Sequence, residues 1–309
     1  MRILFWGTPE FSLPPLRALI GEAFDVVGVV TQPDKPVGRS RSTLEAPPVK
    51  KMAIEEGIPV FQPERPRGDE FMAQIGALEP DVSVVVAYGH ILSQQVIDLP
   101  RLGTINIHAS LLPKLRGAGP IQASILQGDT ETGVTIMRMV KALDAGPSIL
   151  QMRTPIPDDE TFGELQLRLA EMGAMALIEA LALMAIDRAT ETPQSDVEAT
   201  YAPKVDRPMT RVDWAADASV VARTIRAFDP KPGAFTQFNA MDVKLFGARL
   251  IGASAGAPGE VLAIDDAGMV VACGTGSVRI ANVQPAGKRR IAPVEWLRGR
   301  GIAVGQRLS

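Results

Sequence analysis

The feature that most constrains the fold is a short, almost wholly apolar run at residues 81–87. Four of these seven residues are valine, and they leave no continuous polar face. A strand of this kind is typical of a parallel sheet that helices cover on both sides. We therefore expect a strand from Asp81 to Ala87 inside such a sheet.

The first thirty residues predict a parallel strand–helix–strand unit. An apolar strand at Arg2–Trp6 is followed by a turn at Gly7 and by a helix at Pro9–Ile20, which Thr8 is expected to cap. A second strand follows at Asp25–Val30. Gly7 lacks the further glycines of a Gly-x-Gly-x-x-Gly motif, so a dinucleotide site is not indicated. The pattern predicts an α/β, Rossmann-like open parallel sheet.

Two polar side chains stand at the end of a later strand, Thr104–His108. Asn106 and His108 alternate with two isoleucines, so both side chains lie on one face of the strand. There an amide donor and an imidazole can converge on a single carbonyl oxygen, an arrangement that suits acyl transfer.

A carboxylate is expected to complete this site. A helix at Pro120–Gln127 and a strand at Gly133–Met139 precede Asp144, which lies in a turn. We expect the strand–helix–strand segment to be a parallel crossover, which would return Asp144 to the edge of the sheet that carries His108.

Length and composition restrict the class of protein. A chain of 309 residues favours one large and one smaller domain. It opens on a predicted strand with no leader before it, and it has no membrane-spanning apolar run, so we expect a cytoplasmic protein. A single cysteine, Cys273, and only two histidines argue against a disulfide framework and a Cys/His zinc site, and we expect no metal.

The second half of the chain changes in character after about residue 188. Residues 189–211 contain three prolines among polar residues and are the predicted linker between a domain at 1–188 and one at 212–309. From Phe235 onwards, short strands alternate with turns, at residues 235–238, 243–251, 259–264, 268–273 and 278–283. This spacing predicts a small antiparallel β-barrel.

Several motifs together resemble those of one enzyme family. They are Asn106 with His108, the loop Ser110–Gly117, the segment Leu143–Gly146 and, along the rest of the chain, Gly7–Phe11, Thr31–Asp34, Val84–Gly89 and Gln284–Lys288. The chain is similar over nearly its whole length to 10-formyltetrahydrofolate-dependent formyltransferases, most closely those acting on methionyl-initiator tRNA. Ala142 stands where the family usually has glycine before the Leu-Asp pair. This difference affects only the local backbone of the turn, because alanine resists positive φ.

The resemblance implies an activity and a set of site residues. It implies formyl transfer from the co-substrate 10-formyltetrahydrofolate to the amino group of methionyl-initiator tRNA, with Asn106, His108 and Asp144 as the catalytic residues. It places the folate pocket at Ser110, Leu111, Leu112, Pro113, Tyr88 and Gly89. It also implies that the second domain is an OB-like barrel that binds tRNA. His90 is expected to be an exposed loop histidine outside the chemistry.

The distribution of charge agrees with an RNA partner for one domain. Residues 1–203 carry 17 basic and 26 acidic side chains, a net charge of −9, whereas residues 204–309 carry 15 and 9, a net charge of +6. The proline-rich segment Gln32–Pro48 is expected to be a long loop, and the resemblance gives its Arg39 and Arg41 to tRNA. Lys288, Arg289 and Arg290 form a second predicted tRNA-binding cluster. We expect a monomer.

Other functions stay open at this level. A relative with the same first domain could formylate an amino-sugar nucleotide instead of RNA. A hydrolase or dehydrogenase could remove formyl groups, although the dehydrogenase would need a long additional catalytic domain. A non-enzymatic RNA-binding module is the alternative from a different class, and RNA affinity without turnover would favour it.

Overall fold

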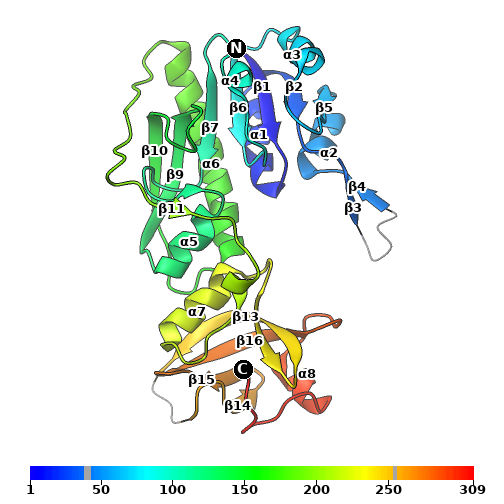
Figure 1. Ribbon diagram of the computed structural model, residues 1–309, viewed down its shortest axis with the longest axis vertical. Coiled ribbons are helices and arrows are strands. Elements are labelled where there is room, and N and C mark those ends of the chain that lie inside the picture. The colour runs from blue at the N-terminus through cyan, green and yellow to red at the C-terminus, as the bar shows by residue number, and fades with distance from the viewer. Residues whose placement is uncertain (38–42, 253–255) are drawn as a thin grey trace. The chain divides into compact units, whose positions relative to one another are not determined.

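The computed structural model describes residues 1–37, 43–252 and 256–309 (Figure 1). These residues form two compact units. Unit 1 comprises Met1–Gly117, Thr132–Thr154 and Gln166–Tyr201, and unit 2 comprises Ala118–Glu131, Pro155–Leu165 and Ala202–Ser309. The predicted domain ranges follow the chain in order, whereas each unit is assembled from three separate segments.

Unit 1 is built on a seven-stranded sheet with the strand order β10-β9-β7-β6-β1-β2-β5. The strands are β1 (Arg2–Gly7), β2 (Asp25–Val30), β5 (Val60–Phe61), β6 (Val82–Val86), β7 (Thr104–His108), β9 (Glu131–Arg138) and β10 (Ser148–Pro155). The five adjacent strands β7, β6, β1, β2 and β5 run parallel to one another. All five residues of β6 are buried. The predicted Rossmann-like sheet is therefore confirmed, with β6 inside it.

Strand β9 differs from the prediction. It pairs with β7 in the antiparallel sense, with Asn106 opposite Met137 and His108 opposite Thr135. The expected parallel crossover is wrong. The helix between the two strands, α5 (Pro120–Gln127), belongs to unit 2, where it packs against α7 (Ala218–Ala227). The antiparallel pairing of β9 makes the sheet of unit 1 mixed.

Helices cover both faces of the sheet of unit 1. On one face Phe71 and Ile75 of α3 and Val96 of α4 pack with Leu4 and Trp6 of β1. On the other face α6 approaches β7 so closely that a Cβ at Gly173 would lie 2.9 Å from Ile107 Cγ2. The remaining bounds are η1 (Glu10–Ser12), α1 (Leu13–Gly21), α2 (Pro48–Glu55), α3 (Asp69–Gly76), α4 (Gln94–Ile97) and α6 (Phe162–Ala185).

Two sequence predictions need correction near the start of the chain. The segment Gln32–Pro48 is not loop throughout, because β3 (Lys35–Val37) pairs with β4 (Thr43–Glu45) as antiparallel strands. Three-residue strands are too short to show a period-two pattern, which is why the sequence did not reveal them. Thr8 does not cap the first helix: its hydroxyl donates to the carbonyl of Tyr88 at 3.0 Å and so ties the ends of β1 and β6 together.

Unit 2 contains a five-stranded antiparallel sheet with the order β12-β13-β16-β15-β14. Its strands are β12 (Ala234–Phe238), β13 (Met241–Ile251), β14 (Val261–Asp265), β15 (Gly268–Ala272) and β16 (Ser277–Pro285). The five predicted strands are thus all present. The short elements η2 (Pro208–Thr210) and α8 (Pro293–Arg298) also belong to unit 2, whereas β8 (Arg116–Gly117) belongs to unit 1. Strand β11 (Tyr201–Ala202) lies where the chain passes from unit 1 to unit 2.

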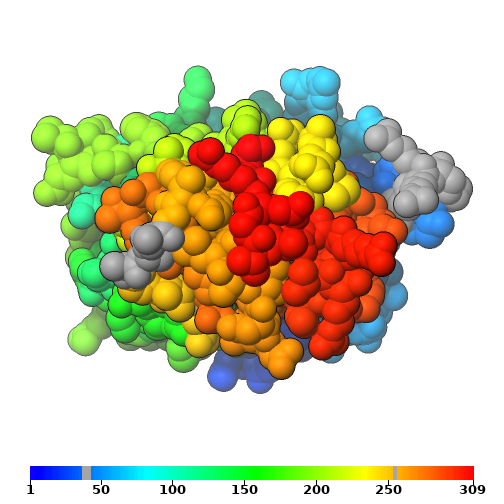
Figure 2. Space-filling model, turned by 90° about the horizontal axis from the view of Figure 1, so that it is seen from below, coloured from blue at the N-terminus to red at the C-terminus, as the bar shows by residue number. Residues whose placement is uncertain are grey.

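The core of unit 2 lies between this sheet and helix α7, which the sequence analysis did not predict. Ile225 and Phe228 from the helix region pack with Leu245 and Val283 from the sheet. The last residues of the chain complete the unit, since Ser309 exchanges backbone hydrogen bonds with Gln237 of β12. Figure 2 shows this segment in red on the surface of the unit.

Within residues 1–37, 43–252 and 256–309, no helix combines the length and the apolar character that crossing a bilayer requires.

Candidate active site

The site lies at the carboxyl edge of the parallel strands, where open α/β sheets commonly bind ligands. Val85 of β6 is in register with Asn106 of β7, so the residues that follow the two strands leave the sheet side by side. Tyr88 and Gly89 follow β6, and Ser110 follows β7. The predicted folate and catalytic residues therefore share one edge.

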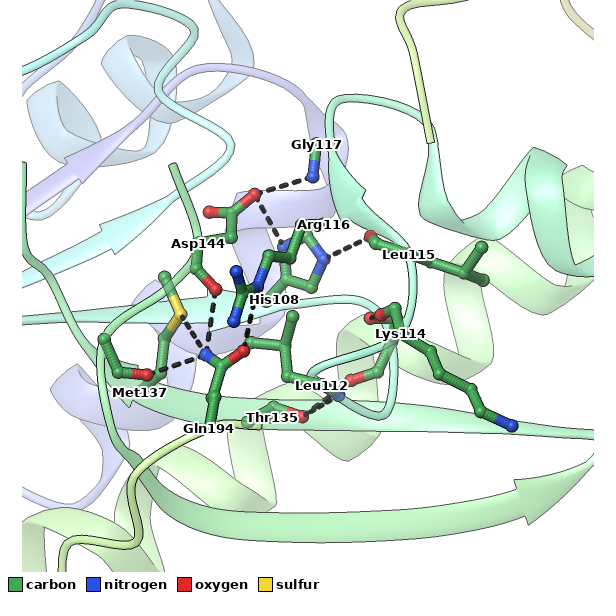
Figure 3. Close-up of polar contacts among 12 residues, drawn as sticks. His108, Leu112, Lys114, Leu115, Arg116, Gly117, Thr135, Met137, Asp144 and Gln194 are labelled. Atoms are coloured by element: carbon green, nitrogen blue, oxygen red, sulfur yellow. Dashed lines mark hydrogen bonds and ion pairs between the residues drawn. The ribbon is translucent and has the colours of Figure 1, made fainter. Parts of the chain in front are cut away.

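His108 and Asp144 are in contact, as the sequence pattern predicted. The His108 Nδ1 atom lies 3.6 Å from Asp144 Oδ2, and its Nε2 atom lies 2.9 Å from the carbonyl oxygen of Leu115 (Figure 3). The imidazole is 5% exposed. Asn106 is half-buried, and its side chain makes no hydrogen bond with the described residues.

Both neighbours of the His108 ring are hydrogen-bond acceptors. A backbone carbonyl accepts hydrogen bonds only, and an ionised carboxylate does the same. Both ring nitrogens of His108 therefore face acceptor oxygens. For His108 to bind a substrate oxygen through Nε2, the carbonyl of Leu115 must give up its place.

Asp144 is held in a left-handed turn. Its φ is 48°, a conformation that costs a non-glycine residue roughly 1 kcal/mol. Ala142, in contrast, is not among the described residues with positive φ, so the alanine there fits the turn. The Asp144 carboxylate accepts a hydrogen bond from the Gly117 N–H at 2.8 Å, and that bond fixes the oxygen which faces His108.

Two residues that the sequence analysis gave no role support this turn. The Gln194 side-chain amide donates to the carbonyls of Asp144 at 2.8 Å and Gly146 at 2.7 Å, while its oxygen accepts from Arg116 Nε at 3.0 Å (Figure 3). Arg116 is 3% exposed and also pairs with Asp196 at 2.9 Å. Its Nη2 atom is buried without a hydrogen-bond partner among the described residues.

The predicted folate loop is closed by hydrogen bonds within unit 1. Thr135 Oγ1 donates to the carbonyl of Ser110 at 2.7 Å and accepts from the N–H of Leu112 at 3.2 Å. Gln151 Nε2 donates to the carbonyl of Leu112 at 2.7 Å, and the N–H of Lys114 donates to the carbonyl of Leu111. The shape of the loop Ser110–Pro113 is thus set before any ligand arrives.

Tyr88 and Gly89 are equally constrained. The carbonyl of Tyr88 accepts from Thr8 and, at 3.1 Å, from Gln32 Nε2. Gly89 has a φ of +90°, and a Cβ there would lie 2.7 Å from the same Gln32 atom, so only glycine fits. The Tyr88 hydroxyl is buried and has no partner among the described residues. Burial raises the pKa of Tyr88 to about 12, so the hydroxyl keeps its proton at physiological pH.

His90, which follows this turn, is exposed, as predicted, and its ring centroid lies 5.7 Å from that of Tyr88.

The residues predicted to bind tRNA are only partly described. Arg39 and Arg41 lie outside the described residues. In unit 2, Arg289 is exposed and pairs with Glu295 at 3.0 Å. Arg290 pairs with the buried Asp229 at 3.4 Å and lies over the ring of Phe246. Lys288 is exposed, and its carbonyl accepts from Gln284 at 3.0 Å. Their role in RNA binding stays a prediction.

In the described ranges, no group of three or more His, Cys, Asp or Glu side chains is placed to hold a metal ion. Cys273 is buried, and this burial raises the pKa of its thiol to about 11.

Comparison with solved structures supports the fold. HypX from Aquifex aeolicus, in complex with tetrahydrofolic acid, superposes with a TM-score of 0.69 at 22% identity, over 96% of this chain and 47% of HypX. WlaRD, a sugar 3N-formyl transferase, gives a TM-score of 0.68 at 17% identity, over 94% of this chain and 99% of that one. At these identities the likeness concerns the fold alone.

Sequence comparison identifies the family. Residues 1–181 match the family model described as formyl transferase, and residues 204–301 match formyl transferase, C-terminal domain. A methionyl-tRNA formyltransferase from Methylococcus capsulatus is 47% identical over 100% of both chains. One from Magnetococcus marinus is 46% identical over 100% of this chain and 98% of its own. The chain therefore belongs to the formyl transferase family, alongside proteins named methionyl-tRNA formyltransferase.

Proposed function

We propose that this protein transfers the formyl group of 10-formyltetrahydrofolate to the α-amino group of methionyl-initiator tRNA. The observation that carries the proposal is the contact of Asp144 with His108, which lies on the same strand as Asn106. Relatives named methionyl-tRNA formyltransferase align with this chain along its full length. These relatives also match across unit 2, and the basic surplus of residues 204–309 suits an RNA acceptor.

The reaction joins an amine nitrogen to the formyl carbon. Attack turns the formyl oxygen into an oxyanion, and collapse of the tetrahedral intermediate breaks the bond between that carbon and N10 of the folate. The amine loses one proton, and N10 gains one. Asn106 is the fixed donor to the oxyanion, because its side-chain amide is half-buried on the strand and has no partner among the described residues.

His108 supplies the second donor and moves the proton. In its imidazolium form, it keeps Nδ1–H on Asp144 and presents Nε2–H to the reacting atoms when Leu115 O is displaced. Leu115 has a φ of 60°, an unfavourable conformation for a leucine, so relaxation of this residue would offset part of the cost of moving its carbonyl. The ring gives its Nε2 proton to N10 as the bond to the formyl carbon breaks, and it accepts the proton that the amine releases. Asp144 stabilises the ring while it carries the positive charge.

We place the folate co-substrate against the loops at this edge. The closed loop Ser110–Pro113 and the turn Tyr88–Gly89 form a preformed wall, and the unpartnered Tyr88 hydroxyl is a buried donor suited to a polar ring atom. We propose that these residues bind the folate.

The remaining proposals concern location and assembly. We propose that the protein is active as a monomer. A charged tRNA as acceptor supports a cytoplasmic location. We assign tRNA contacts to Arg39, Arg41 and the cluster Lys288–Arg290 within this proposal.

The test is a direct comparison of acceptors. The purified protein is incubated with 10-formyltetrahydrofolate and either methionyl-initiator tRNA, methionyl-elongator tRNA or a dTDP-linked amino sugar, and the formylated product is measured. We expect transfer to methionyl-initiator tRNA. Transfer to the amino sugar alone would replace this proposal by the sugar-nucleotide alternative, and RNA binding without transfer to any acceptor would favour a binding module.

A further inference from the structure

We infer that Gln194 is a positioning residue for the reaction, which acts by holding Asp144 against His108. The inference rests on the proposed function only because its kinetic test measures formyl transfer. It concerns residues 192–200, which we call the strap. The strap follows α6 in the chain and lies within the range that the sequence analysis gave to an interdomain linker.

The strap contacts both groups that flank the His108 ring. On the Nδ1 side, Gln194 holds the Asp144 turn through two carbonyls, at 2.8 and 2.7 Å. On the Nε2 side, Thr200 Oγ1 accepts from the N–H of Leu115 at 2.9 Å. The carbonyl of that same Leu115 faces Nε2. The strap therefore sets the positions of both acceptors between which the imidazole lies.

Gln194 links the Asp144 turn to the loop that contains Leu115 and Gly117. Its amide nitrogen bonds to the Asp144 turn, and its amide oxygen accepts from Arg116, the neighbour of both Leu115 and Gly117. The Gly117 N–H in turn donates to the Asp144 carboxylate. Figure 3 shows this hydrogen-bonded ring. The Asp144 side chain is bound by the Gly117 N–H, and its backbone carbonyl is connected to the same loop through Gln194.

The conformation of Asp144 explains why such support is needed. A residue at a φ of 48° tends to relax to negative φ unless its surroundings prevent it. The Gln194 amide group binds the carbonyls of Asp144 and Gly146, which flank Ala145 in the turn. Loss of that amide would therefore remove the support of the turn at both positions. The side chain facing His108 would then move with the turn.

The experiment uses two substitutions that separate the functions of the amide. Gln194→Leu removes both, whereas Gln194→Glu keeps an acceptor for Arg116 and removes the donors to Asp144 and Gly146. Glu198→Gln is the matched control, because its side chain is exposed on the same strap and makes no hydrogen bond or ion pair with the described residues. All are compared with the full-length wild-type protein.

We expect both Gln194 variants to lower kcat for formyl transfer by roughly 10- to 100-fold, as small displacements of a catalytic group do, with KM for the folate within about threefold. Glu198→Gln should match the wild type. In an Asp144→Ala background, Gln194→Leu should cost less than about twofold more, because the residue acts through Asp144. A wild-type kcat for Gln194→Glu, or full additivity with Asp144→Ala, would overturn the inference.

A second measurement does not depend on turnover. Hydrogen exchange of the Gly117 amide reports on its bond to the Asp144 carboxylate, and we expect it to exchange several-fold faster in Gln194→Leu but not in Glu198→Gln. Unchanged exchange at Gly117 in a folded Gln194→Leu protein would contradict the positioning role. Failure of the wild type to formylate methionyl-tRNA would instead count against the proposed function and leave this measurement decisive for Gln194.

Discussion

At the scale of single residues, His108 is defined by what surrounds it. It lies between a carboxylate and a backbone carbonyl, with Asn106 two positions earlier on the same strand face. Removal of an oxyanion donor typically lowers turnover by about 100- to 1,000-fold, and removal of an acid–base group by about 100- to 10,000-fold.

We therefore predict that Asn106→Ala, His108→Ala and Asp144→Ala each reduce kcat within these ranges, because all three side chains act on the transition state. KM for the folate should change little. Steady-state kinetics with circular dichroism as a folding control measures this, and near-normal turnover in a folded variant would remove that residue from the mechanism.

Tyr88 allows a prediction in which stability and binding move in opposite directions. Its hydroxyl is buried without a partner among the described residues, and such a group costs about 1–3 kcal/mol. We predict that Tyr88→Phe raises the free energy of unfolding by about 1 kcal/mol and weakens folate binding, if the hydroxyl serves the ligand.

Thermal unfolding and isothermal titration with tetrahydrofolate measure these two effects of Tyr88→Phe. Because the pKa of Tyr88 is about 12, neither effect should vary between pH 6 and 9. Lower stability with unchanged affinity would show that the hydroxyl has a structural partner instead.

The site could be predicted from sequence only where the signal is local. Asn106 and His108 stand two residues apart, and period-two alternation placed them together. Gln194 contacts Asp144 across a separation of 50 residues, from a proline-rich stretch without periodicity. No local pattern shows which carbonyl a distant amide will bind, so its place in the site required the structure.

At the scale of elements, the direction of β9 shows what periodicity leaves undetermined. The apolar pattern correctly located a strand near 133–139 and a helix at Pro120–Gln127. Whether they form a crossover depends on where the helix packs, and α5 packs against α7. The predicted contact between His108 and Asp144 was nevertheless confirmed, because the turn after β9 brings Asp144 back beside β7.

The start of α6 carries a capping box that fixes its first turn. Thr161 Oγ1 and N both donate to Glu164 Oε2, at 2.7 and 2.9 Å, and the Glu164 N–H faces Thr161 Oγ1 at 3.4 Å. These bonds from Thr161 lower the pKa of Glu164 below its ordinary value of 4.5. The helix therefore begins at Phe162, directly after Thr161.

We predict that Thr161→Ala lowers the unfolding free energy by about 1 kcal/mol at neutral pH, which corresponds to roughly 2 °C in apparent Tm. A carboxyl with a lowered folded-state pKa stabilises above its ordinary pKa and loses that contribution as the pH falls. The difference between wild type and Glu164→Ala should therefore shrink below pH 4.5. Scanning calorimetry across pH tests this, and a difference that is constant to pH 3 would contradict it.

At the scale of the whole molecule, charge separates along the sequence, and the cluster Lys288–Arg290 lies in the basic part. Its members are not equivalent. Lys288 and Arg289 are exposed, and the exposed ion pair of Arg289 with Glu295 contributes little. Arg290 partly serves the fold, since it pairs with the buried Asp229.

We predict that the double variant Lys288→Ala, Arg289→Ala weakens binding of cognate and non-cognate tRNA alike. It should reduce the slope of log affinity against log salt by up to roughly one per charge removed. Folate affinity should stay unchanged. Arg290→Ala should in addition lower thermal stability, because it leaves Asp229 without its cation. An unchanged salt slope in the double variant would exclude these two residues as RNA contacts.

The discontinuity of the two units bears on how this protein can be divided or recombined. The chain passes from one unit to the other five times, after residues 117, 131, 154, 165 and 201. A fragment that begins at Ala202 therefore lacks α5, the packing partner of α7. In a chimera that joins residues 1–201 of this chain to the end of a relative, a foreign α7 would meet the native α5. The success of such an exchange depends on the fit between those two helices and not on the length of the segment that joins them.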